Sequence, residues 1–120
     1  MPQPSNVVSI HPYFKVHPGK LEAVRALLPK FVAQTQSEKD CLYYDFTIDG
    51  DTVHCREAYV GAEGVAAHLD NVGALLDEML RNCDLLRLEL HGPAAELDKL
   101  RPRCEPLNPA WFVFECGVKK

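Results

Sequence analysis

The sequence predicts a single α+β domain in which an antiparallel sheet carries helices on one face. Its 120 residues make one domain of ordinary size. Runs of β-branched and aromatic residues alternate with segments of helical periodicity in the order β-α-β-β-α-β, followed by one more helix and strand. The composition, 47% hydrophobic and 25% charged, excludes a disordered or collagen-like chain.

Charge and hydropathy argue against a nucleic-acid or a membrane partner. Acidic residues outnumber basic ones by 17 to 13, whereas a generic nucleic-acid-binding protein has a basic excess. No apolar run is long enough to span a bilayer, and the first residues lack the charged and apolar regions of a signal peptide. We therefore expect a soluble, cytoplasmic protein with no nucleic-acid or membrane partner.

The cysteine pattern fits neither a zinc site nor a C-x-x-C redox pair. We expect free thiols in a reducing compartment at Cys41, Cys55, Cys83, Cys104 and Cys116. A nucleophilic Cys55 beside a histidine is the alternative. No spacing of His, Asp or Glu indicates a metal site.

The first strand and the first helix each contain a proline. The strand is predicted over residues 7–14, at a sheet edge or with a bulge, because Pro12 interrupts it. Apolar residues at helical spacing predict a helix over 21–32. Pro29 falls inside that pattern, so we expect the helix to be kinked or cut there.

A β-hairpin is the clearest local signal in the sequence. Strand-forming runs over 41–48 and 52–60 are joined through the dipeptide Asp-Gly at 49–50, which is typical of a two-residue type I′ turn. With that turn the numbers of paired residues sum to 99. This register places Asp45 opposite His54.

Alternation along the hairpin separates an apolar face from a polar one. The apolar face carries Leu42, Tyr44, Phe46, Val53, Cys55, Glu57 and Tyr59. The polar face carries Tyr43, Asp45, Thr47, His54, Arg56 and Ala58. Glu57 is the lone carboxylate on the apolar face, where it needs a partner or a raised pKa because burying a bare charge is costly.

The second half of the chain alternates helices and strands. A helical region over 61–80 has an apolar stripe that includes His68, which is therefore predicted to face inward. A strand over 85–91 follows, and then a short helix over 93–100. A proline-rich loop leads to a last strand over 111–116. No linker or internal repeat divides the chain, so residues 1–120 are predicted to form one domain.

Several short motifs, taken in order, resemble a known family. They are Pro18-Gly19-Lys20, Asp40-Cys41-Leu42-Tyr43-Tyr44, Arg56-Glu57-Ala58-Tyr59 and Ala67-His68-Leu69. This succession resembles the antibiotic biosynthesis monooxygenase (ABM) type of dimeric α/β barrel. The resemblance covers a core of about 7–90, and a helix–strand extension over about 92–116 lies outside the minimal pattern.

The resemblance implies a ferredoxin-like monomer that pairs with a second copy through its sheet, forming a barrel. It also implies a pocket between sheet and helices, for which Glu57, Tyr59 and His68 are the matching positions, with Tyr44 at an aromatic position. Tyr59 stands where many relatives have Trp. Enzymes of this type oxidise phenols, quinols or anthrone-like polyketides with O2 and no metal or flavin, and relatives degrade haem or isomerise small sugar-like molecules. The chain lacks a matching Asn of a haem-degrading site, so haem is not favoured and no cofactor is expected.

Cofactor-free oxygenation requires a base whose pKa is close to ambient pH, in an apolar pocket that holds little water. We expect His68 to be the base and Glu57 to orient it, with Tyr44 or Tyr59 donating a hydrogen bond to the developing oxyanion. The expected function is a cofactor-independent monooxygenase of a small aromatic, quinol or polyketide-like molecule.

Three alternatives stay open at this point. The same His and Glu suit an isomerase of a small carbonyl compound. The barrel could bind a small apolar ligand without catalysis, its histidine and glutamate forming a structural pair. If the polar face of the hairpin lined the pocket, His54 and Asp45 would be the better acid–base pair.

Overall fold

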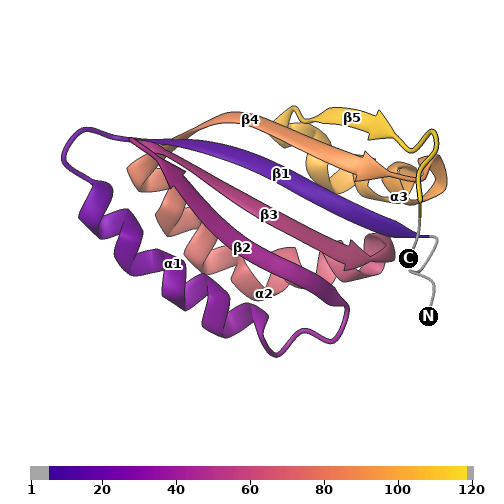
Figure 1. Ribbon diagram of the computed structural model, residues 1–120, viewed down its shortest axis with the longest axis horizontal. Helices are drawn as coiled ribbons and strands as arrows, with labels where there is room; N and C mark the ends of the chain where they lie inside the picture. The colour runs from indigo at the N-terminus through magenta and orange to yellow at the C-terminus, as the bar shows by residue number, and fades with distance from the viewer. Residues whose placement is uncertain (1–5, 119–120) are drawn as a thin grey trace.

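The computed structural model describes residues 6–118 and confirms the α+β class, with the strand order β2-β3-β1-β4-β5 (Figure 1). The elements are β1 (Val7–Val16), α1 (Leu21–Thr35), β2 (Cys41–Asp49), β3 (Thr52–Val60), α2 (Gly61–Asn82), β4 (Cys83–Gly92), α3 (Ala94–Cys104), the 3-10 turn η1 (Glu105–Leu107) and β5 (Ala110–Val113). The order of the first four strands is that of a ferredoxin-like sheet.

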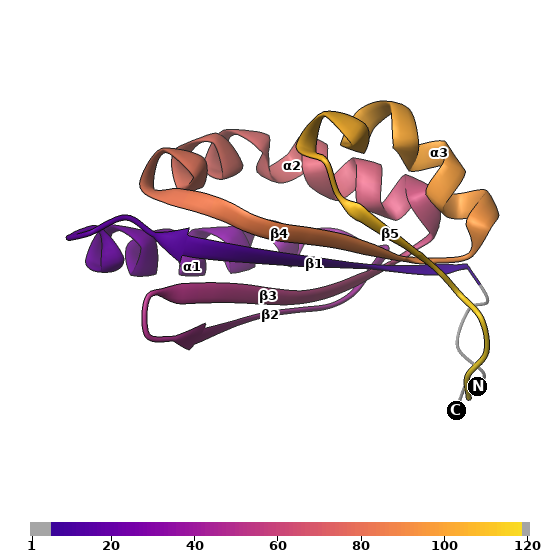
Figure 2. The ribbon, with the colours of Figure 1, turned by 90° about the horizontal axis from the view of Figure 1, so that it is seen from above.

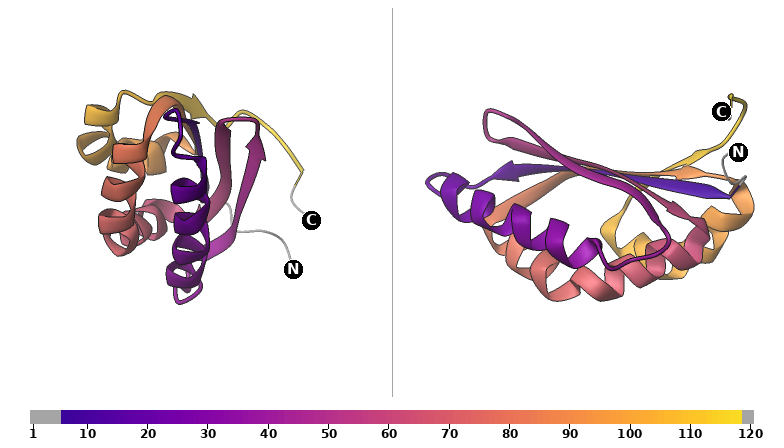
Figure 3. Two further views of the ribbon diagram at one scale, coloured as in Figure 1. Left: turned by 90° about the vertical axis from the view of Figure 1, so that its left-hand side faces the viewer. Right: turned by 60° about the horizontal axis from the view of Figure 1, so that its bottom comes forward.

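The helices lie on one side of the sheet, as predicted (Figures 2 and 3). β1 to β4 pair antiparallel, whereas the added strand β5 pairs parallel to β4. The sheet is open and does not close into a barrel within residues 6–118. Its second face is not covered by any helix among residues 6–118, so pairing with a second copy through that face stays a prediction.

The predicted hairpin exists, but its register is wrong by two residues. Its partners sum to 101, as in the pair of Asp45 with Arg56, and His54 lies opposite Thr47. The loop consists of Gly50 and Asp51, and Gly50 has a φ of +61°. A positive φ at the first loop position alone is the type II′ pattern, which favours Gly there. A two-residue shift preserves side-chain alternation, so both faces keep their predicted residues.

The proline in β1 lies near a bulge, as predicted, whereas the proline in α1 does not cut the helix. β1 is a central strand between β3 and β4, and its pairing with β4 has a bulge between Tyr13 and Phe14, where the extra residue is Leu86 of β4. The bulge lies close to Pro12, which cannot donate a hydrogen bond to the ladder. α1 is one uncut helix through Pro29, which lies on its exposed side.

The C-terminal elements also differ from the prediction in their bounds. α3 runs through Pro102 to Cys104, beyond the predicted end at residue 100. β5 covers Ala110–Val113, a shorter strand than the predicted 111–116. All five cysteines are free thiols. No helix of the described residues is both long and apolar enough to span a membrane.

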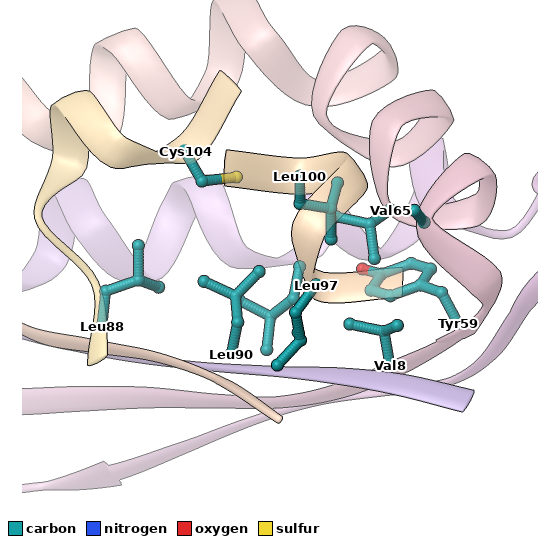
Figure 4. Close-up of a cluster of buried hydrophobic side chains, with 10 residues drawn as sticks. Val8, Tyr59, Val65, Leu88, Leu90, Leu97, Leu100 and Cys104 are labelled. Carbon is teal, nitrogen blue, oxygen red and sulfur yellow. The ribbon is translucent and has the colours of Figure 1, made fainter. Parts of the chain in front are cut away.

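Two apolar clusters hold the helices on the sheet. One joins α3 and the start of α2 to β1, β3 and β4 (Figure 4), and it includes Val8, Tyr59, Val65, Leu90, Leu97 and Leu100. The other joins α1 and the later part of α2 to the far end of the sheet, and it includes Phe14, Val24, Phe31, Val53, Val72 and Met79. The candidate site lies on the inner face of the sheet, beneath α2.

Candidate functional site

Glu57 is a buried carboxylate in the middle of the sheet. It lies on β3 between Ile10 of β1 and Tyr44 of β2, and only 5% of the residue is exposed. The Tyr59 hydroxyl donates a hydrogen bond of 2.5 Å to Oε1 of Glu57. Burial raises the pKa of Glu57 to about 7, although hydrogen bonds from Tyr59 and Cys55 act in the opposite direction.

His68 reaches the same place from α2, where the helical stripe turns it inward as predicted. The residue is 3% exposed, and its Nε2 lies 3.5 Å from Oε1 of Glu57. Burial lowers the pKa of His68, while the hydrogen bond and negative charge of Glu38 raise it. The neutral imidazole is therefore favoured by the apolar surroundings and opposed by Glu38.

Glu38 is a functional candidate that the sequence analysis missed. It lies between α1 and β2, and its carboxylate oxygens are 3.1 and 2.9 Å from Nδ1 of His68. Its segment is polar and carries no pattern that indicates a site. No periodicity marks the residue, because its contact with His68 depends on how the loop returns over α2.

A cavity of about 70 Å³ lies between the sheet and the helices, and Glu57, His68 and Tyr44 are on its wall. Most of the other lining residues are apolar, among them Ile10, Phe14, Phe31, Leu69, Val72 and Leu90. A single water molecule needs about 10–15 Å³ of such space, so the cavity is larger than one water molecule requires. The wall therefore combines a titratable pair with a largely apolar surface.

The two tyrosines occupy different positions in this arrangement. The ring of Tyr44 lines the cavity with its centroid 5.0 Å from that of His68, and burial raises the pKa of its hydroxyl. Tyr59 is fully buried, is not among the lining residues, and directs its hydroxyl at Glu57. Tyr44 is thus placed to meet a bound molecule, whereas Tyr59 acts on Glu57.

His54 and Asp45 do not form the alternative acid–base pair. Both lie on the opposite face of the sheet, and the corrected register separates them. Asp45 accepts a hydrogen bond of 3.2 Å from Arg56, and Nδ1 of His54 lies 2.8 Å from the carbonyl oxygen of Pro12. Neither residue lines the cavity.

Cys55 lines the cavity but is unsuited to nucleophilic attack. Burial raises the pKa of its thiol, and the neighbouring Glu57 carboxylate raises it further. The thiolate is the nucleophilic form of cysteine, so this surrounding keeps the group unreactive. The site chemistry available from the wall of the cavity is proton transfer by Glu57 and His68.

Comparison with solved structures identifies the relatives of this chain. The crystal structure of MupZ from Pseudomonas fluorescens is 36% identical and superposes with a TM-score of 0.91, covering 96% of this chain and 95% of MupZ. The chain belongs to the same family as MupZ.

Structures named as antibiotic biosynthesis monooxygenases from other bacteria share the fold at lower identity, so the chain has an ABM-type fold. A candidate antibiotic biosynthesis monooxygenase from Chloroflexus aurantiacus is 19% identical, with a TM-score of 0.61 over 73% of this chain and 93% of its own. Another, from Caulobacter crescentus, is 18% identical, with a TM-score of 0.65 over 72% of this chain and 88% of its own. No protein-family profile and no curated protein matches the chain.

Proposed function

We propose that this ABM-type chain is an acid–base enzyme that acts on a small apolar or aromatic molecule bound in the cavity. The observation behind the proposal is the pairing of Glu57 and His68 on the wall of an otherwise apolar cavity. Glu57 has a pKa of about 7, so both its protonated and its ionised forms exist near neutral pH. Such a pair can exchange protons with a substrate that is shielded from water.

The reaction that we propose is mono-oxygenation without a metal or an organic cofactor. The site removes a proton from a phenol or an activated CH2 group, and the resulting electron-rich anion reduces O2 directly. The CH2 group becomes C=O, or in a phenol an aromatic C–H carbon becomes C=O and the product is a quinone. In both cases the second oxygen atom leaves as water, so the substrate supplies all four electrons. Tyr44 would donate a hydrogen bond to the oxygen on which negative charge develops.

A second candidate is isomerisation of a small carbonyl compound. It is favoured by the presence of two titratable groups, His68 and Glu57, side by side on the cavity wall. In isomerisation one group removes a proton from one carbon and the other group delivers a proton to a different atom of the substrate. Mono-oxygenation does not need this second proton transfer. This reaction consumes no O2.

Oxygen uptake separates these reactions. We expect the purified chain, treated with a metal chelator, to consume one O2 for each anthrone or hydroquinone molecule oxidised, well above the rate without protein. Deuterium exchange into a small ketone without O2 uptake would favour the isomerase and contradict the oxygenase. Absence of both, in a correctly folded sample, would contradict acid–base catalysis on these substrates.

We also propose that a second copy covers the open face of the sheet. That face carries two stacked ring pairs, Tyr13 on His54 at 4.2 Å and His91 on Phe112 at 4.4 Å. A copy related by twofold symmetry would bury these rings. Sedimentation equilibrium should give twice the chain mass of 13.4 kDa, and a mass of one chain at micromolar concentration would contradict the pairing.

A further inference from the structure

The two ring nitrogens of His68 face two different carboxylates. Nδ1 lies 2.9 Å from one oxygen of Glu38 and 3.1 Å from the other, both within hydrogen-bonding distance. Nε2 lies 3.5 Å from Oε1 of Glu57, which is longer than an ordinary hydrogen bond. Glu38 is therefore the closer and better-placed partner of the ring.

Glu38 is itself held in place from α2. The side-chain amide of Asn71 donates to Oε2 of Glu38 at 2.7 Å and to the backbone oxygen of Gln34 at 2.9 Å. The amide of Gln34 donates back to the backbone oxygen of Asn71. The Glu38 side chain is only 9% exposed. Since Asn71 follows His68 by three residues, the helix that carries the histidine also fixes its partner.

The position of the ring proton follows from these contacts. An ionised carboxylate only accepts hydrogen bonds, so the hydrogen between Glu38 and His68 belongs to Nδ1. In a neutral imidazole the other nitrogen, Nε2, then carries the lone pair. We propose that Glu38 is the positioning residue of the site: it holds His68 in the Nδ1–H form, so that Nε2 faces Glu57 and the cavity as a proton acceptor. The catalytic part of this role rests on the proposed function, whereas the placement of the proton does not.

Loss of Glu38 has two expected consequences for His68. The groups around the ring are Glu38 from the segment after α1, Glu57 from β3, and the rings of Tyr44 and Tyr59 at 5.0 and 4.9 Å. Without Glu38, the carboxylate that remains lies on the Nε2 side, so the proton should move to Nε2. Burial would then lower the pKa of His68 further, because the hydrogen bond and charge of Glu38 that raise it are gone.

Nitrogen-15 NMR of the imidazole tests this directly, because a protonated and an unprotonated ring nitrogen have very different chemical shifts. Three samples with nitrogen-15-labelled histidine are compared: wild type, Glu38→Ala, and the control Glu78→Ala. Glu78 is an exposed glutamate on α2, the helix that carries His68. We expect the Nδ1–H form in wild type and in the control. Glu38→Ala should show the Nε2–H form and a lower His68 pKa. Glu38→Met, which keeps the side-chain length, replaces Glu38→Ala if that variant does not fold.

A wild-type His68 in the Nε2–H form, or an unchanged form in the folded Glu38 variants, would overturn the proposal. Where the wild type is active, Glu38→Ala should also lower kcat by about 10- to 100-fold with little change in KM. The acid limb of its pH profile should move to lower pH. An inactive wild type that shows the Nδ1–H form would contradict the proposed function and still support the positioning role.

Discussion

Replacing Glu57 by Gln is expected to lower kcat by about 100- to 10,000-fold, the usual contribution of a positioned acid or base. Gln has nearly the same shape and still accepts the hydrogen bond from Tyr59, but it cannot take up or release a proton. The measurement is O2 uptake, or deuterium exchange if the isomerase reaction is found. Glu78→Gln, at an exposed position on α2, should retain wild-type activity.

The lower kcat of Glu57→Gln should not come from unfolding. The pKa of Glu57 is raised from 4.5 to about 7 in the folded chain. The folded state therefore binds more protons than the unfolded state in this range, and its stability falls as the pH rises from about 4.5 through about 7. Gln does not titrate, so the free energy of unfolding of Glu57→Gln relative to wild type should rise by about 3 kcal/mol as the pH goes from about 4.5 to about 7. A variant that is fully active while folded would contradict a role for Glu57 in proton transfer.

Leu97→Ala is expected to lower the free energy of unfolding by about 2–5 kcal/mol, the usual effect of Leu→Ala in a core. Leu97 of α3 is fully buried, and Figure 4 shows it beside Leu90 above the sheet, in the same cluster as Val8. Removing its methyl groups leaves a space that the helix and sheet around it cannot easily close. Urea unfolding measures the change.

The matched control for this variant is Leu86→Ala on β4. Leu86 is 56% exposed, so its truncation should change the free energy of unfolding by about 0.5 kcal/mol or less. Equal effects of the two substitutions would mean that α3 is not part of the folding unit. The difference tests the helix–strand extension: the two lower-identity structures described above cover 73% and 72% of the chain, whereas MupZ covers 96%.

The sequence was sufficient to predict which faces meet at the site. Alternation along β3 placed Glu57 among apolar side chains, and helical spacing placed His68 on the inner side of α2. Both inferences depend only on the period of each element. That period survived the two-residue error in the hairpin register, because the turn began at Gly50 and a shift by two keeps every side chain on its face.

Other features could not be predicted because they depend on tertiary structure. Glu38 meets His68 through a loop whose path is fixed by Asn71 on another element. The side-chain pattern of a strand does not encode its direction, so the parallel pairing of β5 with β4 followed only from the course of α3 between them. The cavity itself is the space that packing leaves, which no local pattern describes.

The central claim is that Glu57, the carboxylate buried beside His68, itself takes up and releases a proton near neutral pH. Carbon-13 NMR titration of the glutamate side-chain carboxyl groups tests it most directly, with Glu57→Gln used to identify the Glu57 signal. The account predicts a midpoint at about pH 7 for that signal. A midpoint near the ordinary glutamate value of 4.5 would contradict it.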